Sequence, residues 1–166
     1  MQELELMIPN LNELEYRRYL ISDEKTMDYN KGYGDNGTGC YYQTIEQEKE
    51  WYKNWNNGTN NYYAYIIRKE DNIPIGEVDI HWSGYCQRHI IGIVIEAKYR
   101  GKGYAEEALN LLCDVAFNEL KLDKIYDDFP VTRTVAEKVF ANGGFVRENN
   151  EFVALTKDRY NQIHKK

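Results

Sequence analysis

Apolar and polar positions alternate along several short segments of the chain, and turn-forming residues bound each of these segments. A period of two, or a short apolar run between turns, is typical of β-strands. Apolar residues three and four positions apart are typical of helices that pack one face against a core. The pattern predicts six strands, at residues 4–8, 62–68, 75–82, 89–95, 124–129 and 151–156, and four helices, beginning near residues 12, 44, 105 and 134.

Cap and turn residues mark where the predicted helices begin and end. Glycine-containing turns at residues 56–58 and 143–144 end the second and fourth helices. Residues 28–42 contain four glycines and little periodicity, which predicts a mobile loop that is either functional or simply disordered. Three pairs with the spacing of a capping box precede helices: Asn12 with Glu15, Thr44 with Gln47, and Thr134 with Glu137.

The order of the elements is a strand, two helices, a three-stranded meander, a helix, a strand, a helix and a strand. The run at residues 89–95 is apolar on both faces, which is typical of a central strand. This order predicts a mixed α/β or α+β protein built on a single sheet. Neither a linker nor an internal repeat divides residues 1–166, so we expect one domain.

Composition and charge narrow the classes of ligand. Hydrophobic residues make up 42% of the 166 residues and charged residues 29%, as in ordinary globular proteins. The net charge is −6, and residues 1–60 carry 11 acidic against 6 basic residues. No basic cluster of the kind that binds nucleic acid occurs, so we expect no nucleic-acid partner. The acidic first part would suit a small cationic ligand, although a solvated acidic surface that aids solubility is the default interpretation.

Cysteines and apolar runs indicate the compartment. Cys40, Cys86 and Cys113 are odd in number and widely spaced, which predicts neither a disulfide framework nor a metal site. The longest apolar run, at residues 90–95, is too short to span a bilayer. The first residues lack the pattern of a signal peptide. We therefore expect a cytoplasmic protein that binds neither metal nor membrane.

The segment after the central strand combines glycines with basic residues. Residues 93–95 are apolar, residues 100–106 are Arg-Gly-Lys-Gly-Tyr-Ala-Glu, and helical spacing begins at Ala105. A strand, a tight turn and a helix start in this order present free backbone N–H groups and the positive end of the helix dipole. The sequence therefore predicts a site for a phosphate or pyrophosphate group at this turn.

Two nucleotide-binding patterns fail at this turn, and a third pattern fits it. The segment has no G-x-x-x-x-G-K-[ST] motif, and its G-x-G-x-x-G motif is incomplete and follows a meander. Arg100-x-x-Gly103-x-Ala105 instead resembles the Q/R-x-x-G-x-G/A signature of the GNAT superfamily of acyl-CoA-dependent N-acyltransferases. The resemblance extends from about residue 73 to a helix that ends in Gly144-Phe145. It is closest to the branch that includes ribosomal-protein and small-amine acetyltransferases.

This resemblance implies a single mixed, mostly antiparallel sheet flanked by about four helices. It also implies direct transfer of an acetyl group from acetyl-CoA to a primary amine in a ternary complex. The acceptor would be a small amine or a protein N-terminus, and a homodimer is among the assemblies that we expect. The strand whose backbone would pair with the pantetheine arm comprises Ile93, Val94 and Ile95, although a plain core strand would have the same sequence. The turn that would wrap the coenzyme A pyrophosphate comprises Arg100, Gly101, Lys102, Gly103, Tyr104, Ala105 and Glu106.

Acetyl transfer requires a base, because alkyl amines have a pKa of about 10 and attack only when neutral. The alternation at residues 75–82 places Glu77, Asp79 and His81 on one face of a strand, and Glu96 follows the central strand. Glu77 is our first choice as the general base because it lies mid-strand beside the expected thioester. Alternating polar residues are also typical of a solvated sheet face, which is the competing interpretation for each of the four.

Two positions depart from the superfamily pattern. Phe140 stands where many members carry a tyrosine that protonates the leaving thiolate, and Arg133 takes the place of a common asparagine. A thiol with a pKa of about 8.5 still leaves tolerably as the thiolate, so we expect activity. The alternative that Phe140 favours is a non-catalytic acyl-CoA-binding or regulatory domain. The acceptor is expected near three segments: residues 28–42, the helix bearing Trp51 and Trp55, and the end of the meander at Trp82.

Overall fold

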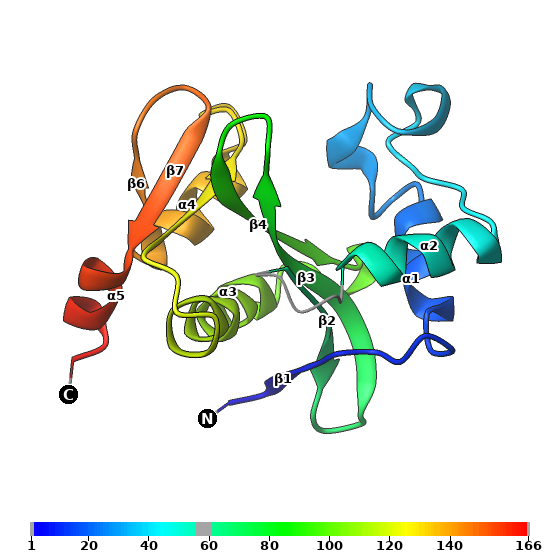
Figure 1. The fold of residues 1–166 in the computed structure, drawn as a ribbon, viewed down its shortest axis with the longest axis horizontal. Helices are drawn as coiled ribbons and strands as arrows, with labels where there is room; N and C mark the ends of the chain where they lie inside the picture. Colours follow the sequence, from blue (N-terminus) through cyan, green and yellow to red (C-terminus); the bar gives the residue numbers. More distant parts are fainter. Residues whose placement is uncertain (1, 56–60, 166) are drawn as a thin grey trace.

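The computed structural model describes residues 2–55 and 61–165, which form a seven-stranded sheet with the order β1-β2-β3-β4-β5-β7-β6 (Figure 1). All six expected strands are present, and the apolar run at residues 89–95 lies in the central strand, β4. Pairing is antiparallel except between β4 and β5, which confirms the predicted mixed, mostly antiparallel sheet. The strands are β1 (Leu4–Met7), β2 (Tyr62–Arg68), β3 (Ile73–Ser83), β4 (Arg88–Ile95), β5 (Lys124–Asp128), β6 (Val146–Arg147) and β7 (Phe152–Thr156).

Five α-helices lie in the described residues, one more than expected. The expected end of α2 at residues 56–58 falls outside the described residues. No helix in residues 2–55 or 61–165 combines the length and the apolar character that crossing a membrane requires. The helices are α1 (Glu15–Ser22), α2 (Ile45–Trp55), α3 (Tyr104–Asp114), α4 (Thr134–Asn142) and α5 (Lys157–Ile163). A π-helical turn at Val115–Glu119 continues α3, and 3-10 turns lie at Asp28–Asn30, Asp35–Gly37 and Ala97–Tyr99.

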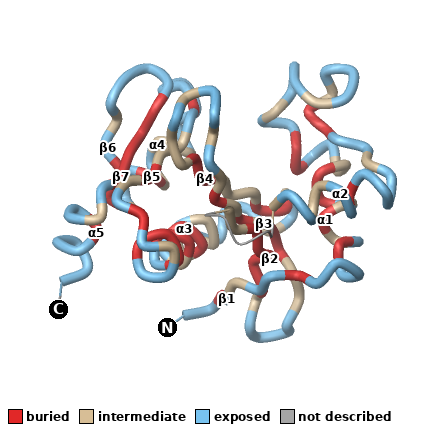
Figure 2. The backbone as a smooth tube through the Cα atoms, in the orientation of Figure 1, coloured by how far each residue is buried: buried red, intermediate tan, exposed pale blue. Residues whose placement is uncertain are grey.

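Strand β2 is buried on both faces, and this places helices on both sides of the sheet (Figure 2). Ala64 and Ile66 belong to the main core, which α3 and α4 cover. The alternate residues Tyr63, Tyr65 and Ile67 form a second cluster, which aromatic side chains of α1 and α2 cover. Because successive side chains of a strand point to opposite faces, α1 and α2 lie on the face opposite α3 and α4.

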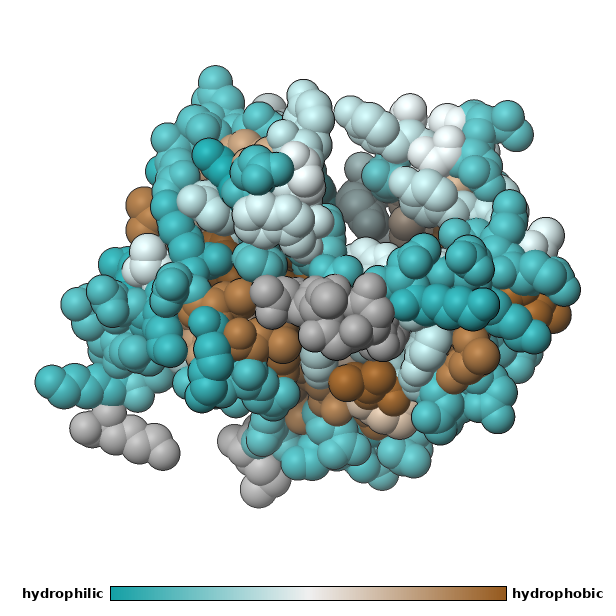
Figure 3. Space-filling model, viewed as in Figure 1, coloured by the Kyte–Doolittle hydropathy of each residue, from teal (hydrophilic) through white to brown (hydrophobic). Residues whose placement is uncertain are grey.

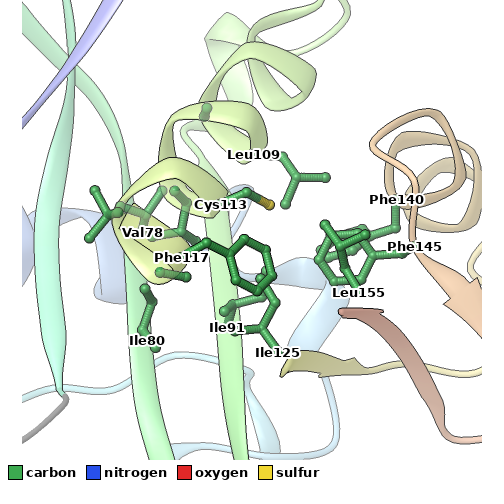
Figure 4. Close-up of a cluster of buried hydrophobic side chains, with 14 of the residues drawn as sticks. Val78, Ile80, Ile91, Leu109, Cys113, Phe117, Ile125, Phe140, Phe145 and Leu155 are labelled. Carbon is green, nitrogen blue, oxygen red and sulfur yellow. The ribbon is translucent and has the colours of Figure 1, made fainter. Parts of the chain in front are cut away.

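The main core joins the helical segment from α3 to the centre of the sheet (Figure 4). Phe117 points from this segment towards Ile91 and Ile125, whereas Leu109 points to the side on which Phe140 and Phe145 lie. Phe140 of α4 and Phe145 pack edge to face, with ring centroids 4.9 Å apart. The fully buried side chains of α3 follow the helical spacing that the sequence predicts, so this helix holds the glycine turn at its own N-terminus against the sheet.

The sheet separates at its centre, between β4 and β5. β4 pairs with β3 along all eight of its residues, from Arg88 to Ile95. With β5 it forms a single pair, Ile90 with Tyr126. The edge of β4 that faces β5 therefore has no described strand partner beyond this pair, and its backbone groups are available to a ligand.

The three expected capping boxes have different outcomes. Thr44 and Gln47 form theirs: each side chain accepts a hydrogen bond from the other's backbone N–H, at 3.1 and 2.9 Å. The expected start of α1 at Asn12 is wrong, since the helix begins at Glu15 and has no side-chain cap. The expected cap at Thr134 is also wrong, because Thr134 is itself the first residue of α4.

Residues 28–42 form an irregular loop with two 3-10 turns, as the glycines predict. The backbone N–H of Asp35 donates to the carbonyl of Cys40 at 2.8 Å, which closes the loop on itself. The N–H of Tyr41 donates to the carbonyl of Ile21 at 2.8 Å, which ties the loop to α1. The loop is thus placed beside the open centre of the sheet, and its mobility stays a prediction.

Candidate active site

A cleft of about 890 Å³ lies where β4 and β5 separate. Strands β3 and β4 form its floor, the loop at residues 28–42 and helix α2 form one wall, and the end of β5 with the start of α4 forms the other. The surface is hollowed between the lobe of the β3–β4 hairpin and the lobe of this loop (Figure 3). The segments that we expected around the acceptor, apart from Trp82, therefore meet at one place.

Glu77 lines the cleft, while the next residue, Val78, points into the main core. Burial raises the pKa of Glu77 from 4.5 to about 7. Tyr63 and the positive charge of Arg17 lower this pKa, and the negative charge of Asp79 raises it further. A carboxyl group with a pKa near 7 is partly ionised at neutral pH and can accept a proton from an amine.

Asp79 and His81 also line the cleft and form a pair. The Nδ1 atom of His81 lies 2.8 Å from a carboxylate oxygen of Asp79. This hydrogen bond raises the pKa of His81 above its usual value. The imidazole packs against Trp55 of α2, with ring centroids 5.3 Å apart. The alternation of β3 thus brings three of the four candidate bases onto one side of the cleft.

Glu96, the fourth candidate base, has a different environment. Its buried carboxylate accepts hydrogen bonds from the hydroxyls of Tyr16 at 2.9 Å and Tyr19 at 3.3 Å. Lys98 lies 3.4 Å away as an ion-pair partner. Glu96 does not line the cleft. Its contacts anchor α1 to the segment that precedes the glycine turn.

The end of β4 supplies backbone to the cleft. Ile93 and Val94 line it, and their edge of β4 has no strand partner on the β5 side among the described residues. Ile95 lies in the main core instead, and its carbonyl accepts a hydrogen bond from the Nε of Arg100 at 3.1 Å. An extended ligand between β4 and β5 would therefore meet the backbone of Ile93 and Val94 first.

The glycine turn leaves open space in front of the first turn of α3. Gly101 and Gly103 have φ angles of 78° and 81°, a conformation that residues with a side chain rarely adopt. A Cβ atom at either position would meet no described heavy atom within 4 Å. No side chain caps α3, so the N–H groups of its first turn have no partner within the helix. These features fit a pyrophosphate group.

Arg100 contributes to this turn through its contacts with the chain itself. Its guanidinium donates to the carbonyls of Thr26 at 2.6 Å and Lys25 at 3.4 Å. The side chain therefore ties the turn to the segment that leads into residues 28–42. The remaining side chains of the turn differ: Lys102 is exposed, Glu106 accepts a hydrogen bond from Asn142 at 3.0 Å, and Tyr104 and Ala105 pack against the main core.

Phe140 and Arg133 occupy the two positions that depart from the superfamily pattern. Phe140 is buried in the main core, and its ring centroid lies 5.2 Å from that of Phe129. It supplies no proton donor. Arg133 lines the cleft, and its guanidinium lies 4.9 Å from the ring centroid of Tyr29. The loop at residues 28–42 thus reaches across the cleft to the start of α4.

Three further residues of the cleft were not predicted from the sequence. Arg17 of α1 is buried, stacks 3.5 Å from the ring centroid of Trp51, and donates to Gln43 at 2.7 Å. Asp127 lies at the end of β5, and burial raises its pKa well above the usual range. Tyr63 lines the cleft from β2. Tyr63 and Tyr65 lie two positions apart in this strand and so share one face, and this spacing was the signal that could have identified Tyr63.

Trp82 lies outside the cleft. Its side chain is 47% exposed and packs against His89, with ring centroids 4.9 Å apart. The other two tryptophans of the expected acceptor region, Trp51 and Trp55, do line the cleft. The tryptophan side chains that line the cleft therefore come from α2 and not from β3.

Comparison with known proteins agrees with this geometry. A family model described as an acetyltransferase (GNAT) domain matches residues 6–146. A probable N-acetyltransferase, YjcK of Bacillus subtilis (strain 168), is 29% identical over 110 residues, which are 65% of this chain and 55% of that protein. The chain thus spans about half the length of this relative.

Solved structures with the same fold extend the comparison to nearly the whole chain. The spermidine N-acetyltransferase from Vibrio cholerae, in complex with CoA and spermine, superposes with a TM-score of 0.78 and is 20% identical. That match covers 96% of this chain and 99% of the other. A GNAT-family acetyltransferase from Bacillus anthracis has a TM-score of 0.70, is 23% identical, and covers 94% and 96% of the two chains. At these identities the likeness establishes the fold.

Proposed function

The chain belongs to the GNAT acetyltransferase family, and we propose that it transfers an acetyl group from acetyl-CoA directly to the primary amine of a small cationic acceptor. The observation that carries this proposal is Glu77, a carboxyl group with a pKa of about 7 in the cleft where β4 and β5 separate. The amine must lose a proton before it attacks. Glu77 accepts that proton, either directly or through a water molecule.

The coenzyme would lie along the opening of the sheet. The N–H groups around Gly101 and Gly103 would hold its pyrophosphate, and the free edge of β4 at Ile93 and Val94 would pair with its pantetheine arm. When bound, acetyl-CoA supplies the thioester whose carbonyl carbon is attacked. A backbone N–H of β4 at this point would stabilise negative charge on the carbonyl oxygen.

A small amine is the acceptor that the cleft supports best. Carboxylates at Glu77, Asp79 and Asp128 line it, and aromatic rings at Trp51 and Trp55 form one wall. Aromatic faces and carboxylates together attract an alkylammonium group. The fold neighbours from Vibrio cholerae act on spermidine, so polyamines are the first acceptors to test, and a protein N-terminus is the next.

The leaving thiolate has no phenol at position 140 to protonate it. A thiol like that of free cysteine has a pKa of about 8.5, so the thiolate is a tolerable leaving group without a dedicated acid. The same residue supports a second candidate function, a non-catalytic acyl-CoA-binding or regulatory domain. The two functions differ in one measurement, which is the release of free thiol when acetyl-CoA is mixed with amines.

The test compares Glu77→Gln with Glu5→Gln, a control on an exposed position of β1. We expect thiol release with a panel of polyamines, other small amines and N-terminal peptides for the unmodified protein. Glu77→Gln lowers kcat by about 100-fold to 10,000-fold because the base is lost, and it leaves acetyl-CoA affinity unchanged. Glu5→Gln changes neither quantity.

Each other outcome has a definite meaning. Full turnover in Glu77→Gln would overturn the assignment of the base. Binding of acetyl-CoA without turnover for any amine would favour the non-catalytic domain. Absence of acetyl-CoA binding would overturn both candidate functions.

A further inference from the structure

The hydroxyl group of Tyr63 is buried at the cleft and forms no hydrogen bond of ordinary geometry with the described residues, although it lies near enough to Glu77 to lower the pKa of that carboxyl group. The side chain is only 2% exposed. Its ring is held by an edge-to-face contact with Trp51, at 4.9 Å between centroids, and by a second with Tyr65, at 6.0 Å. A buried hydroxyl without a well-formed hydrogen bond destabilises the folded state. We therefore expect this hydroxyl to have a role that its contacts in the structure do not show.

The strand register places this hydroxyl beside the proposed base. Tyr63 pairs with Asp79 across β2 and β3, and Tyr65 pairs with Glu77. Tyr63 and Glu77 are therefore diagonal neighbours on one face of the sheet, within reach of a tyrosine side chain. Both line the same cleft.

The elements that pack near Glu77 each bring charged or titratable groups close to its carboxyl group. Of these, Arg17 and Tyr63 favour its ionised form and Asp79 opposes it. The groups are Tyr16 and Arg17 of α1, Tyr29 of the loop at residues 28–42, Tyr63 and Tyr65 of β2, and Asp79 of β3.

Of the two tyrosines of β2 in this group, Tyr63 is the one whose hydroxyl is free to serve Glu77. The hydroxyl of Tyr65 already donates to the carbonyl of Glu13 at 2.6 Å and accepts from the N–H of Arg17 at 3.2 Å. The guanidinium of Arg17 donates to Gln43 and lies 3.5 Å from Glu48.

We propose that Tyr63 is a positioning residue, whose hydroxyl donates a hydrogen bond to the ionised carboxylate of Glu77 and holds that carboxylate towards the acceptor amine. A donor to the charged form of a carboxyl group favours that form. Tyr63 thereby keeps enough of Glu77 ionised near neutral pH, although burial opposes ionisation. This inference rests on the proposed function, in which Glu77 is the base.

The first test is the pH dependence of kcat in Tyr63→Phe. Loss of the hydrogen bond to the carboxylate raises the pKa of Glu77, so the rising limb of the profile moves to higher pH by about one unit. The KM for acetyl-CoA stays unchanged, because Tyr63 is placed beside the base and away from the glycine turn. An unshifted limb in a folded variant would overturn the proposal.

The matched control is Tyr65→Phe, from the same strand, the same face and the same aromatic cluster. Its hydroxyl bonds to the backbone of residues 13 and 17, so its loss lowers the melting temperature without moving the limb. An equal shift of the limb in both variants would show a general effect of the aromatic cluster and would overturn the specific role of Tyr63.

Two further measurements separate this proposal from the proposed function. The carboxyl carbon of Glu77, observed by NMR in protein labelled with 13C-glutamate, reports its titration without any turnover. A higher titration midpoint in Tyr63→Phe supports the hydrogen bond even if no amine is acetylated, and an unchanged midpoint overturns it. Where Tyr63→Phe fails to fold, 3-fluorotyrosine at position 63 provides a stronger donor. It should move the midpoint to lower pH, and an unmoved midpoint again overturns the proposal.

Discussion

At Glu77, the burial that produces a base near neutral pH also opposes folding. Its carboxyl group has a pKa of about 7 in the folded protein against an ordinary value of 4.5. The folded state therefore binds this proton more tightly than the unfolded state does. The resulting stabilisation is fully present below about pH 4.5 and is lost as the pH rises through about 7.

Glu77→Gln removes this titration, so we expect its stability to fall less between pH 4.5 and pH 8 than that of the unmodified protein. Urea unfolding at the two pH values measures the difference. Glu5→Gln should keep the original pH dependence, because its side chain is exposed on β1. Equal pH dependence in Glu77→Gln and the unmodified protein would show that Glu77 titrates at its ordinary pKa in the folded state.

The same residue shows how far the sequence predicts the site. Glu77 was predicted because the alternation within one strand assigns its side chain to the polar face. Tyr63 was not singled out, since its position beside Glu77 depends on the register of β2 against β3. That register shifts between Ile66 and Ile67, and nothing in the local pattern reports such an irregularity.

At the scale of elements, two threonines with the same sequence context behave differently. Thr44 and Thr134 each precede a polar residue of the Glu/Gln type by three positions. Thr44 forms the reciprocal capping box with Gln47. Thr134 forms none, and Glu137 instead accepts three hydrogen bonds from the guanidinium of Arg147, at 2.6 to 3.1 Å.

Thr44→Ala should therefore lower the free energy of unfolding by about 1 kcal/mol, the usual cost of losing a cap. Thr134→Ala is the matched control and should stay within about 0.5 kcal/mol of the unmodified protein. Urea unfolding of both variants at one pH gives the comparison. Equal losses would mean that the threonine itself, and not its cap, determines the effect.

The elements that the sequence missed share a physical reason. Helix α5 has seven residues, of which only Tyr160 is buried, so no apolar stripe marks it. Strand β6 has two residues, too few to show a period. By contrast α3 buries four residues at helical spacing, and the sequence predicts it clearly. A helix or strand is thus easier to predict from periodicity when more residues on one of its faces are buried.

In the molecule as a whole, β4 and β5 separate at the centre of the sheet. Only one pair of residues joins these two strands, whereas most neighbouring strands are joined by several. The pairs β3–β4 and β5–β7 on either side form eight and five residue pairs. A coenzyme between the two parts would add backbone contacts where the sheet has fewest. We therefore expect acetyl-CoA to stabilise the fold as well as to supply the acetyl group.

Acetyl-CoA at 100 times its dissociation constant should add about 2.7 kcal/mol of stability and raise the melting temperature by several degrees. Gly103→Val should abolish this rise. At a φ of 81°, valine strains the backbone and places a branched side chain where the pyrophosphate would approach. Gly37→Val is the matched control, because Gly37 has a φ of 70° and similar open space but lies in the 3-10 turn at Asp35–Gly37 and not at the start of α3.

Both variants should melt at a lower temperature than the unmodified protein when no ligand is present, since each carries the same kind of backbone strain. Only Gly37→Val should then recover the full rise with acetyl-CoA. Calorimetric titration of the two variants tests the same point without heating. Retained affinity in Gly103→Val would mean that the coenzyme binds elsewhere. The edge of β4 that has no strand partner would then have to bind a different ligand.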